Sequence, residues 1–330
     1  MKYRFLGSTG VRVSQVGFGT MSFGGDADEQ TSTQLFQQCR EAGVNLFDCA
    51  DVYQKGRSEE ILGKLIHDCR DEVVITSKVY FPTGDGPNDR GASRYHMLRS
   101  LEGSLRRLGT DRIDLYYVHR FDDYTAIEDV LTSLDIMVRD GKVLYPAVSN
   151  FAAWQVEKVL GTAARRGLVA PVAVQPMYNL VKRQAEVELL PMAEANNLAV
   201  FSYSPLGSGL LSGKYGTADR PRAGRLMENK MHQARYGDER VYEVAERFRE
   251  LAAEWGYHPV SLALAWVGSH PAVTAPLIGA RSPAQLEHAL KSVEIELSEE
   301  QRSQISALSA APPPATDRNE ERTRHNFGAR

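Results

Sequence analysis

The sequence repeats one local pattern eight times: a short, almost continuously apolar run rich in β-branched residues, followed by a longer stretch with helical periodicity. Continuously apolar runs are typical of parallel strands that are buried on both faces. No Pro- or Ser-rich linker interrupts the alternation, which predicts a single parallel α/β domain closed into a (β/α)8 TIM barrel. The predicted strands are Val16–Thr20, Asn45–Asp51, Val73–Val79, Ile113–His119, Val143–Asn150, Val172–Asn179, Leu198–Leu206 and Val273–Ala280.

Helical stretches connect the predicted strands, and several of them end at a glycine. Gly43, Gly109, Gly141 and Gly167 each follow such a stretch, at the position where a helix C-cap favours glycine. The predicted helices are Thr31–Ala42, Ser58–Ile66, Ser93–Leu108, Tyr124–Arg139, Ala153–Arg166 and Glu186–Asn196.

Three segments lie outside the repeated units. Tyr3–Leu6 and Val11–Ser14 flank a Gly-Ser-Thr-Gly turn and predict an N-terminal β-hairpin that caps the bottom of the barrel. A long insertion after the seventh strand, at about residues 207–236, is rich in Gly, Arg and Pro and is interpreted as a lid or as a disordered surface segment. We expect the barrel to span residues 1–310 and a flexible or partner-docking C-terminal extension to span 311–330.

Composition excludes several classes of protein. With 42% hydrophobic and 25% charged residues over 330 positions, the chain is typical of a soluble globular protein and not of a disordered or coiled-coil one. With a net charge of −3, the chain lacks the overall positive field of a non-specific nucleic-acid binder. Without a membrane-spanning run or a secretory signal, we expect a cytoplasmic protein with no nucleic-acid or membrane partner. A homo-oligomer is compatible with the sequence.

The cysteines and histidines do not predict a metal site. Cys39, Cys49 and Cys69 form no C-x-x-C pair, which fits reduced thiols better than a disulfide framework or a zinc ribbon. The eight histidines include no H-E-x-x-H motif and no cysteine–histidine cluster.

Ionisable residues stand where the second, third and fourth predicted strands end. Asp48 and Tyr53 follow the second strand, Lys78 closes the third and His119 closes the fourth. Because desolvating an ammonium costs several kcal/mol, a lysine at a buried strand end needs a carboxylate such as Asp48 beside it. Each residue alone is explained by a solvated strand end or a core histidine. Together they predict a catalytic group in which the lysine lowers the pKa of the tyrosine and the histidine orients a carbonyl.

A series of short motifs runs through the chain in a fixed order. The motifs are Val16-Gly17-Phe18-Gly19-Thr20-Met21, Phe47-Asp48-Cys49-Ala50-Asp51-Val52-Tyr53, Gly56-Arg57-Ser58-Glu59-Glu60-Ile61-Leu62-Gly63, Leu105-Arg106-Arg107-Leu108-Gly109-Thr110-Asp111, Ser149-Asn150-Phe151, Tyr203-Ser204-Pro205-Leu206-Gly207 and Gly279-Ala280-Arg281-Ser282-Pro283. In this order and spacing the chain resembles the aldo-keto reductase family over essentially its whole length, in particular the general branch that includes the Kv-channel β subunits.

The resemblance implies a catalytic tetrad of Asp48, Tyr53, Lys78 and His119. Tyr53 is then the general acid in carbonyl reduction, and Lys78 stabilises its phenolate. Asp48 holds Lys78 in place, while His119 positions the substrate oxygen.

Two common nucleotide-binding motifs are excluded by their spacing. The glycines of Gly17–Gly25 are wrongly spaced for a Rossmann turn, and Gly213-Lys214 lacks the first glycine and the final Ser or Thr of a P-loop. The remaining candidate for a phosphate-binding segment is Gly279–Ser282, where the eighth predicted strand runs into a helix. The helix N-terminus and the donor fork of Arg281 suit an anionic phosphate there.

The resemblance implies NADPH (NADP+) as the cofactor, with Arg281 on its 2′-phosphate. By the same resemblance Ser149, Asn150 and Gln175 bind the carboxamide, and Tyr203 stacks on the nicotinamide. The full set of implied cofactor-binding residues is Gly19, Thr20, Met21, Asp48, Ser149, Asn150, Gln175, Tyr203, Ser204, Pro205, Leu206, Gly209, Leu211, Lys214, Gly279, Ala280, Arg281 and Gln285.

The expected function is the reduction of aldehydes or ketones to alcohols, with a small carbonyl or polyol substrate. Two alternatives stay open: a cofactor-binding, redox-sensing regulatory subunit, and a sugar or polyol dehydrogenase that works in the oxidative direction. The loop at residues 80–91, with Tyr116, Arg120 and Phe121, is expected to form a wall of the substrate site.

Overall fold

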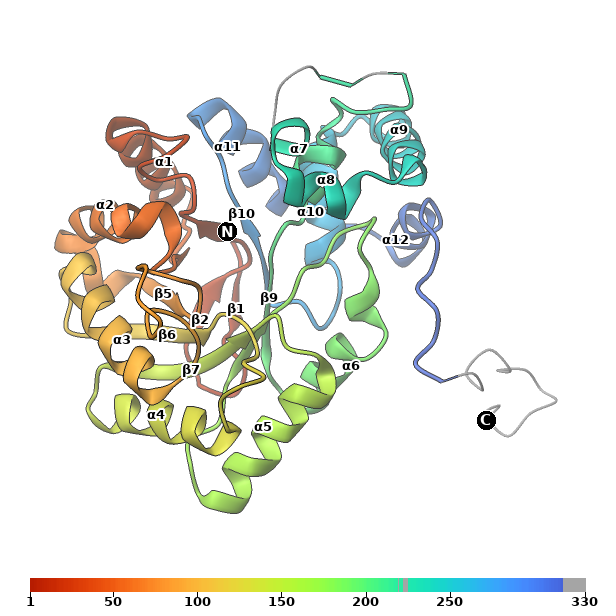
Figure 1. Ribbon diagram of the computed structural model, residues 1–330. Coiled ribbons are helices and arrows are strands. Elements are labelled where there is room, and N and C mark those ends of the chain that lie inside the picture. Colours follow the sequence, from red (N-terminus) through yellow and green to blue (C-terminus); the bar gives the residue numbers. More distant parts are fainter. Residues whose placement is uncertain (219, 222–224, 317–330) are drawn as a thin grey trace.

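Eight parallel strands form a closed barrel in the computed structural model of the chain, which describes residues 1–218, 220–221 and 225–316 (Figure 1). The barrel strands are β3 (Gly17–Gly19), β4 (Leu46–Asp48), β5 (Val74–Val79), β6 (Ile113–Val118), β7 (Val143–Ser149), β8 (Ala173–Gln175), β9 (Ala199–Ser202) and β10 (Ala275–Ile278). Each strand pairs with the next along the chain, and β10 closes the ring by pairing with both β9 and β3. The predicted (β/α)8 barrel is confirmed.

Several strands are shorter than predicted, mainly at their C-terminal ends. In the predicted strand Val172–Asn179 the continuous ladder covers only β8, because Pro176 has no N–H to donate, and a single bridge between Met177 and Tyr203 follows it. The predicted strand Leu198–Leu206 ends with β9, and Ser204 adopts a left-handed conformation with φ 57°. These predicted strand ends are loops at the mouth of the barrel, where barrel enzymes carry their functional residues.

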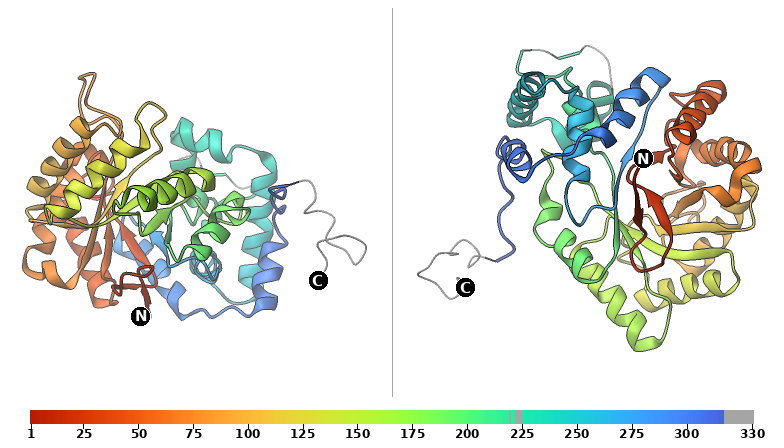
Figure 2. Two further views of the ribbon diagram at one scale, coloured as in Figure 1. Left: turned by 90° about the horizontal axis from the view of Figure 1, so that it is seen from below. Right: turned by 180° about the vertical axis from the view of Figure 1, so that it is seen from behind.

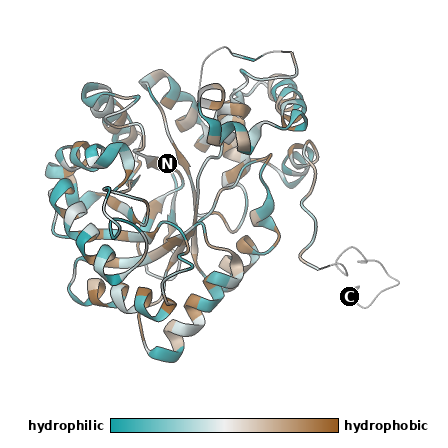
Figure 3. Ribbon diagram, in the orientation of Figure 1, coloured by the Kyte–Doolittle hydropathy of each residue, from teal (hydrophilic) through white to brown (hydrophobic). Residues whose placement is uncertain are grey.

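Helices surround the barrel, and their residues mix polar and apolar types along each helix (Figure 3). Gly109 and Gly167 end two of them in the left-handed conformation, as the sequence predicts. The α-helices are α1 (Glu29–Glu41), α2 (Arg57–Ile66), α3 (Arg94–Leu108), α4 (Ile127–Arg139), α5 (Ala153–Arg166), α6 (Leu189–Ala195), α7 (Arg225–Glu228), α8 (Lys230–Tyr236), α9 (Glu239–Glu254), α10 (Pro259–Gly268), α11 (Pro283–Leu290) and α12 (Glu299–Ser306). The 3-10 helices are η1 (Tyr53–Gly56), η2 (His67–Glu72), η3 (Gln184–Glu186), η4 (Gly207–Ser212) and η5 (Lys291–Glu294).

The strands separate two apolar clusters, one inside the barrel and one beneath the helices. Successive strand residues point to opposite faces, so Leu115 and Tyr117 of β6 belong to the inner cluster and Tyr116 to the outer one. Tyr116 is fully buried there. The expectation that Tyr116 contributes to the substrate wall is therefore wrong.

The predicted N-terminal hairpin is confirmed. β1 (Tyr3–Phe5) pairs antiparallel with β2 (Arg12–Ser14), and the hairpin lies against one end of the barrel (Figure 2). Leu6 and Val13 are fully buried in the inner cluster, and the Ser14 N–H donates to Oδ1 of Asn45, directly before β4, at 2.7 Å. Because the hairpin covers the end where the strands begin, the opposite end is the one that is open to a ligand.

The insertion after the seventh barrel strand contains three short helices, and its described residues 213–218 and 220–221 are turns and irregular segments. These helices are η4, α7 and α8, and Tyr236 at the end of α8 is fully buried. Residues 219 and 222–224 of this insertion, and 317–330 of the predicted C-terminal extension, lie outside the described residues. In the part of the chain that the structure describes, no helix is long and apolar enough to cross a membrane.

Candidate active site

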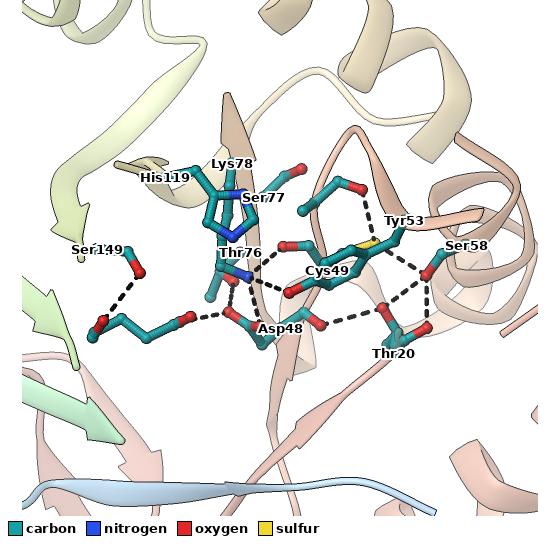
Figure 4. A network of polar contacts seen from close by, with 12 residues as sticks. Thr20, Asp48, Cys49, Tyr53, Ser58, Thr76, Ser77, Lys78, His119 and Ser149 are labelled. Carbon is teal, nitrogen blue, oxygen red and sulfur yellow. Dashed lines mark hydrogen bonds and ion pairs between the residues drawn. The ribbon is translucent and has the colours of Figure 1, made fainter. Parts of the chain in front are cut away.

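A buried lysine–aspartate pair lies where β4 and β5 run side by side (Figure 4). Nζ of Lys78 is 2.6 Å from Oδ2 of Asp48 and 2.7 Å from the carbonyl oxygen of Cys49. Lys78 is 0% and Asp48 3% exposed. Burial acts to lower the pKa of Lys78, but the charge and hydrogen bond of Asp48, together with the neighbouring Tyr53 and Cys49, outweigh burial and the pKa is raised. The ammonium therefore keeps its charge inside the barrel.

The second oxygen of Asp48 is also occupied. Oδ1 accepts hydrogen bonds from Oγ1 of Thr76 at 2.7 Å and from Nε2 of Gln175 at 2.8 Å. Thr76 was not among the predicted site residues. The sequence signal that could have identified it is its position two residues before Lys78, since residues i and i+2 of a strand lie on the same face.

Tyr53 reaches Lys78 from the turn that follows β4. Its hydroxyl lies 3.4 Å from Nζ of Lys78. Gln54 and Lys55 have positive φ angles of 48° and 56°, a sparsely populated conformation that is concentrated at functional sites. Burial raises the pKa of Tyr53 to about 12, although Lys78 acts to lower it. The predicted lowering of this pKa is thus outweighed by desolvation, and the phenol is protonated at neutral pH.

His119 follows β6 and lies beside Tyr53 in the barrel mouth. Its ring is 6.2 Å from the ring of Tyr53 and 4.8 Å from that of Phe81, edge-on to both. Burial, and then the charge of Lys78, hold the pKa of His119 well below its usual range, so the imidazole is neutral. Nδ1 is buried and has no hydrogen-bond partner among the described residues. The imidazole is therefore oriented by its packing against the two rings and not by a side-chain hydrogen bond at Nδ1.

A hydroxyl network holds the main chain on the other side of Asp48 (Figure 4). Oγ of Ser58 donates to the carbonyl oxygen of Thr20 at 2.7 Å and lies 3.3 Å from Sγ of Cys49. Oγ1 of Thr20 donates to the carbonyl oxygen of Asp48 at 3.1 Å. This network fixes the segment whose Cys49 carbonyl accepts from Lys78.

The residues expected at the carboxamide lie together at the ends of β7, β8 and β9. The hydroxyl of Tyr203 donates to Oδ1 of Asn150 at 2.7 Å. Nδ2 of Asn150 lies 3.1 Å from Oγ of Ser149 and 2.9 Å from the carbonyl oxygen of His119. Nε2 of Gln175, the third residue expected at the carboxamide, donates to Oδ1 of Asp48. It connects the carboxamide residues to the lysine–aspartate pair.

The residues expected at the 2′-phosphate and adenine follow β10. Nε of Arg281 lies 2.9 Å from Oδ2 of Asp26. Oε1 of Gln285 accepts the backbone N–H of Arg281 at 3.1 Å, which joins this side chain to the main chain that precedes α11. Lys214 is exposed and forms no ion pair within the described part of the chain.

The remaining predicted cofactor residues also follow strand ends. They are Gly19, Thr20 and Met21 at and after β3, Ser204, Pro205 and Leu206 after β9, Gly209 and Leu211 in η4, and Gly279 and Ala280 after β10. Leu211 is 1% exposed and packs in the outer apolar cluster, so its side chain is not available to a ligand.

The donor set along this end of the barrel fits a nicotinamide dinucleotide. Amide and hydroxyl groups of Ser149 and Asn150 lie near the tetrad, where a carboxamide needs hydrogen-bond partners. Cationic side chains of Lys214 and Arg281 follow β9 and β10, where phosphates need charge. Gly209 adopts φ 92°, and a Cβ atom there would meet nothing within 4 Å, so the backbone is open to a ligand on that side.

The aldo/keto reductase family model matches residues 15–310 of the chain. The chain belongs to this family. An uncharacterized oxidoreductase of Bacillus subtilis is 39% identical over 316 residues, which cover 91% of this chain and 93% of that protein. A probable voltage-gated potassium channel subunit beta of Oryza sativa subsp. japonica is 36% identical over 327 residues, covering 96% and 99%. A protein of Arabidopsis thaliana with the same name is 35% identical over 302 residues, covering 89% and 92%.

Membership of the aldo/keto reductases confirms the resemblance that the motifs predict. The family match begins two residues before β3 and ends four residues after α12, so it includes every barrel strand and excludes β1 and β2. The hairpin and the segment after residue 310 lie outside the residues that the family model matches.

Proposed function

We propose that this aldo/keto reductase uses NADPH to reduce aldehydes or ketones to alcohols, with Tyr53 as the general acid. One observation carries the proposal: a fully buried Lys78 ammonium, paired with Asp48, has the Tyr53 hydroxyl as a further neighbour at 3.4 Å. A buried ion pair is weak evidence for stability, since its desolvation offsets its attraction. A buried charge aimed at a phenol is more readily explained by the proton transfer it assists.

The residues of the site divide the chemistry between them. Bound NADPH supplies the hydride. Tyr53, protonated because its pKa is raised to about 12, donates its proton to the carbonyl oxygen as that oxygen gains negative charge. Lys78 stabilises the phenolate that Tyr53 becomes, and Asp48 keeps Lys78 charged and in place. Neutral His119 helps to orient the carbonyl.

The preference for NADPH over NADH is assigned to Arg281. Its guanidinium presents several N–H donors to a 2′-phosphate, and Lys214 supplies a second cation after β9. Asn150 holds the Tyr203 hydroxyl and so fixes the ring that would stack on the nicotinamide.

Aromatic side chains favour a small carbonyl substrate with an apolar group. Phe81, in the predicted substrate loop, lies against His119. Phe121 packs 5.2 Å from Phe151 and 5.9 Å from Trp154, which is 62% exposed. Such rings bury apolar surface at a binding site better than they bind a polyol.

The test is NADPH consumption with 4-nitrobenzaldehyde, followed by absorbance. Wild-type protein should turn over, and Tyr53→Phe should lose at least about 100-fold in kcat. The variant should keep its affinity for NADP+ by calorimetry, because the ring and its packing remain. Tyr95→Phe, on the exposed side of α3, is the matched control and should behave as wild type. Full activity in Tyr53→Phe would refute the assignment.

A cofactor-binding regulatory subunit is the second candidate, favoured by the two plant relatives named as channel beta subunits. Tight NADPH binding with negligible turnover across a broad panel of carbonyl compounds would support it. The same panel, run with polyols and NADP+, tests a sugar or polyol dehydrogenase.

A further inference from the structure

A tight turn between β3 and α1 presents Asp26 to Arg281. The backbone N–H groups of Gly25 and Ala27 both donate to the carbonyl oxygen of Ser22, at 3.0 and 2.9 Å. These two hydrogen bonds close the turn around Asp26. The main chain that carries Asp26 is thus held in place.

The same turn is bound to the segment that follows β10. β3 and β10 are neighbours in the barrel, so the two segments leave adjacent strands at the same end. Oγ of Ser22 donates to the carbonyl oxygen of Ala280 at 2.8 Å. One residue further along, Nε of Arg281 lies 2.9 Å from Oδ2 of Asp26. The ion pair is therefore part of a built contact between two backbone segments.

We propose that Asp26 reduces the preference of the site for NADPH by opposing its 2′-phosphate at Arg281. The inference rests on the proposed function, because it requires Arg281 to bind that phosphate. A phosphate on Arg281 has to share the guanidinium with the Asp26 carboxylate and is repelled by it. NADH carries a hydroxyl at the same position, and a carboxylate accepts a hydrogen bond from a ribose hydroxyl. Asp26 thus weakens NADPH binding while leaving NADH binding intact.

The size of the effect follows from the exposure of the pair. The side chains of Arg281 and Asp26 are 38% and 49% exposed, so water and salt screen their interaction. Ion pairs of this exposure are worth little, and removing one carboxylate should change an affinity about fivefold. The change should become smaller as the salt concentration rises, because it is electrostatic.

The experiment compares Asp26→Asn with wild type by calorimetric titration of NADP+ and NAD+, at low and high salt. The variant should bind NADP+ about fivefold more tightly at low salt, with NAD+ unchanged or weaker. Asp68→Asn, an exposed aspartate on η2, removes the same charge far from Arg281 and should change neither affinity. Equal changes for both dinucleotides, or no change for NADP+, would overturn the proposal.

Arg281→Ala separates this inference from the proposed function. The proposed function predicts that this variant loses far more affinity for NADP+ than for NAD+. If it does so while Asp26→Asn alters neither affinity, only the role of Asp26 is wrong. If the wild-type protein binds neither dinucleotide, the proposed function is wrong and the role of Asp26 is wrong with it.

Discussion

Nζ of Lys78 lies 2.6 Å from Oδ2 of Asp48 in a part of the barrel that water scarcely reaches. Two further acceptors, the Cys49 carbonyl and the Tyr53 hydroxyl, surround the same ammonium. Because these three neighbours match the three donors of a lysine, the charge is held in one place beside the phenol.

The Lys78–Asp48 pair predicts a non-additive effect on stability. Lys78→Met leaves the Asp48 carboxylate buried and unpaired, and should lower the free energy of unfolding by about 3–5 kcal/mol. Asp48→Asn combined with Lys78→Met should cost less than the two single substitutions together, because no lone charge remains buried. Urea denaturation measures all three variants. Lys64→Met, which breaks an exposed pair with Glu29, is the control and should cost less than about 1 kcal/mol. Additive losses would contradict the prediction.

The pKa directions in the site predict different pH profiles for the two reaction directions. Tyr53, with a pKa of about 12, and neutral His119 keep their protonation states through the neutral range. The kcat/KM for carbonyl reduction should therefore be flat between about pH 6 and pH 9. Alcohol oxidation needs the phenolate of Tyr53 and should rise about tenfold for each pH unit in that range. Steady-state kinetics in both directions test this. A reduction profile that bends near the usual histidine pKa would show that His119 titrates.

Phe81 should act as a positioning residue for His119. Because Nδ1 of His119 has no partner in the described part of the chain, removal of the adjacent ring allows the imidazole to turn. Phe81→Ala should lower kcat about tenfold through misorientation, with the Kd for NADP+ unchanged. Phe81→Leu refills most of the space and should restore much of the rate. Loss of NADP+ affinity in Phe81→Ala would point to a structural defect instead.

The buried Asp51 carboxyl should make the stability of the folded protein depend on pH, independently of catalysis. Its carboxyl is 2% exposed, and burial raises its pKa to about 7, although Oδ2 accepts a hydrogen bond from Oγ of Ser100 at 2.6 Å. The folded state therefore holds this proton more tightly than the unfolded chain does. The resulting stabilisation is complete below about pH 4 and is lost as the pH rises through about 7.

Asp51→Asn is the variant that isolates this effect. Above about pH 7 the variant should be more stable than wild type, by up to about 4 kcal/mol, and the difference should shrink toward pH 5. Urea denaturation at the two pH values measures it, with Asp68→Asn as the exposed control. A difference that does not change with pH would show that Asp51 is already ionised in the folded protein.

The barrel and the N-terminal hairpin were predictable because they depend on local patterns. Apolar runs of strand length, glycines at helix ends and the flanked Gly-Ser-Thr-Gly turn each act over a few residues. The strand ends were predicted less well. Pro176 ends β8 because it has no N–H to donate, and Ser204 turns the chain with a positive φ angle. Both side chains are apolar or small, so hydrophobicity carries no signal at these two positions.

The sequence by itself determined the order of the strands and helices, the family, and the positions of Asp48, Tyr53, Lys78 and His119 at three strand ends. Only the tertiary structure decided the burial, the pKa values and the long-range partners of these groups. Desolvation outweighs Lys78 and raises the pKa of Tyr53, and the Gln175 amide reaches Asp48 from a strand far along the chain. Asp26 meets Arg281 because β3 and β10 close the ring. Burial and long-range contact depend on every element around a residue, and no local pattern encodes them.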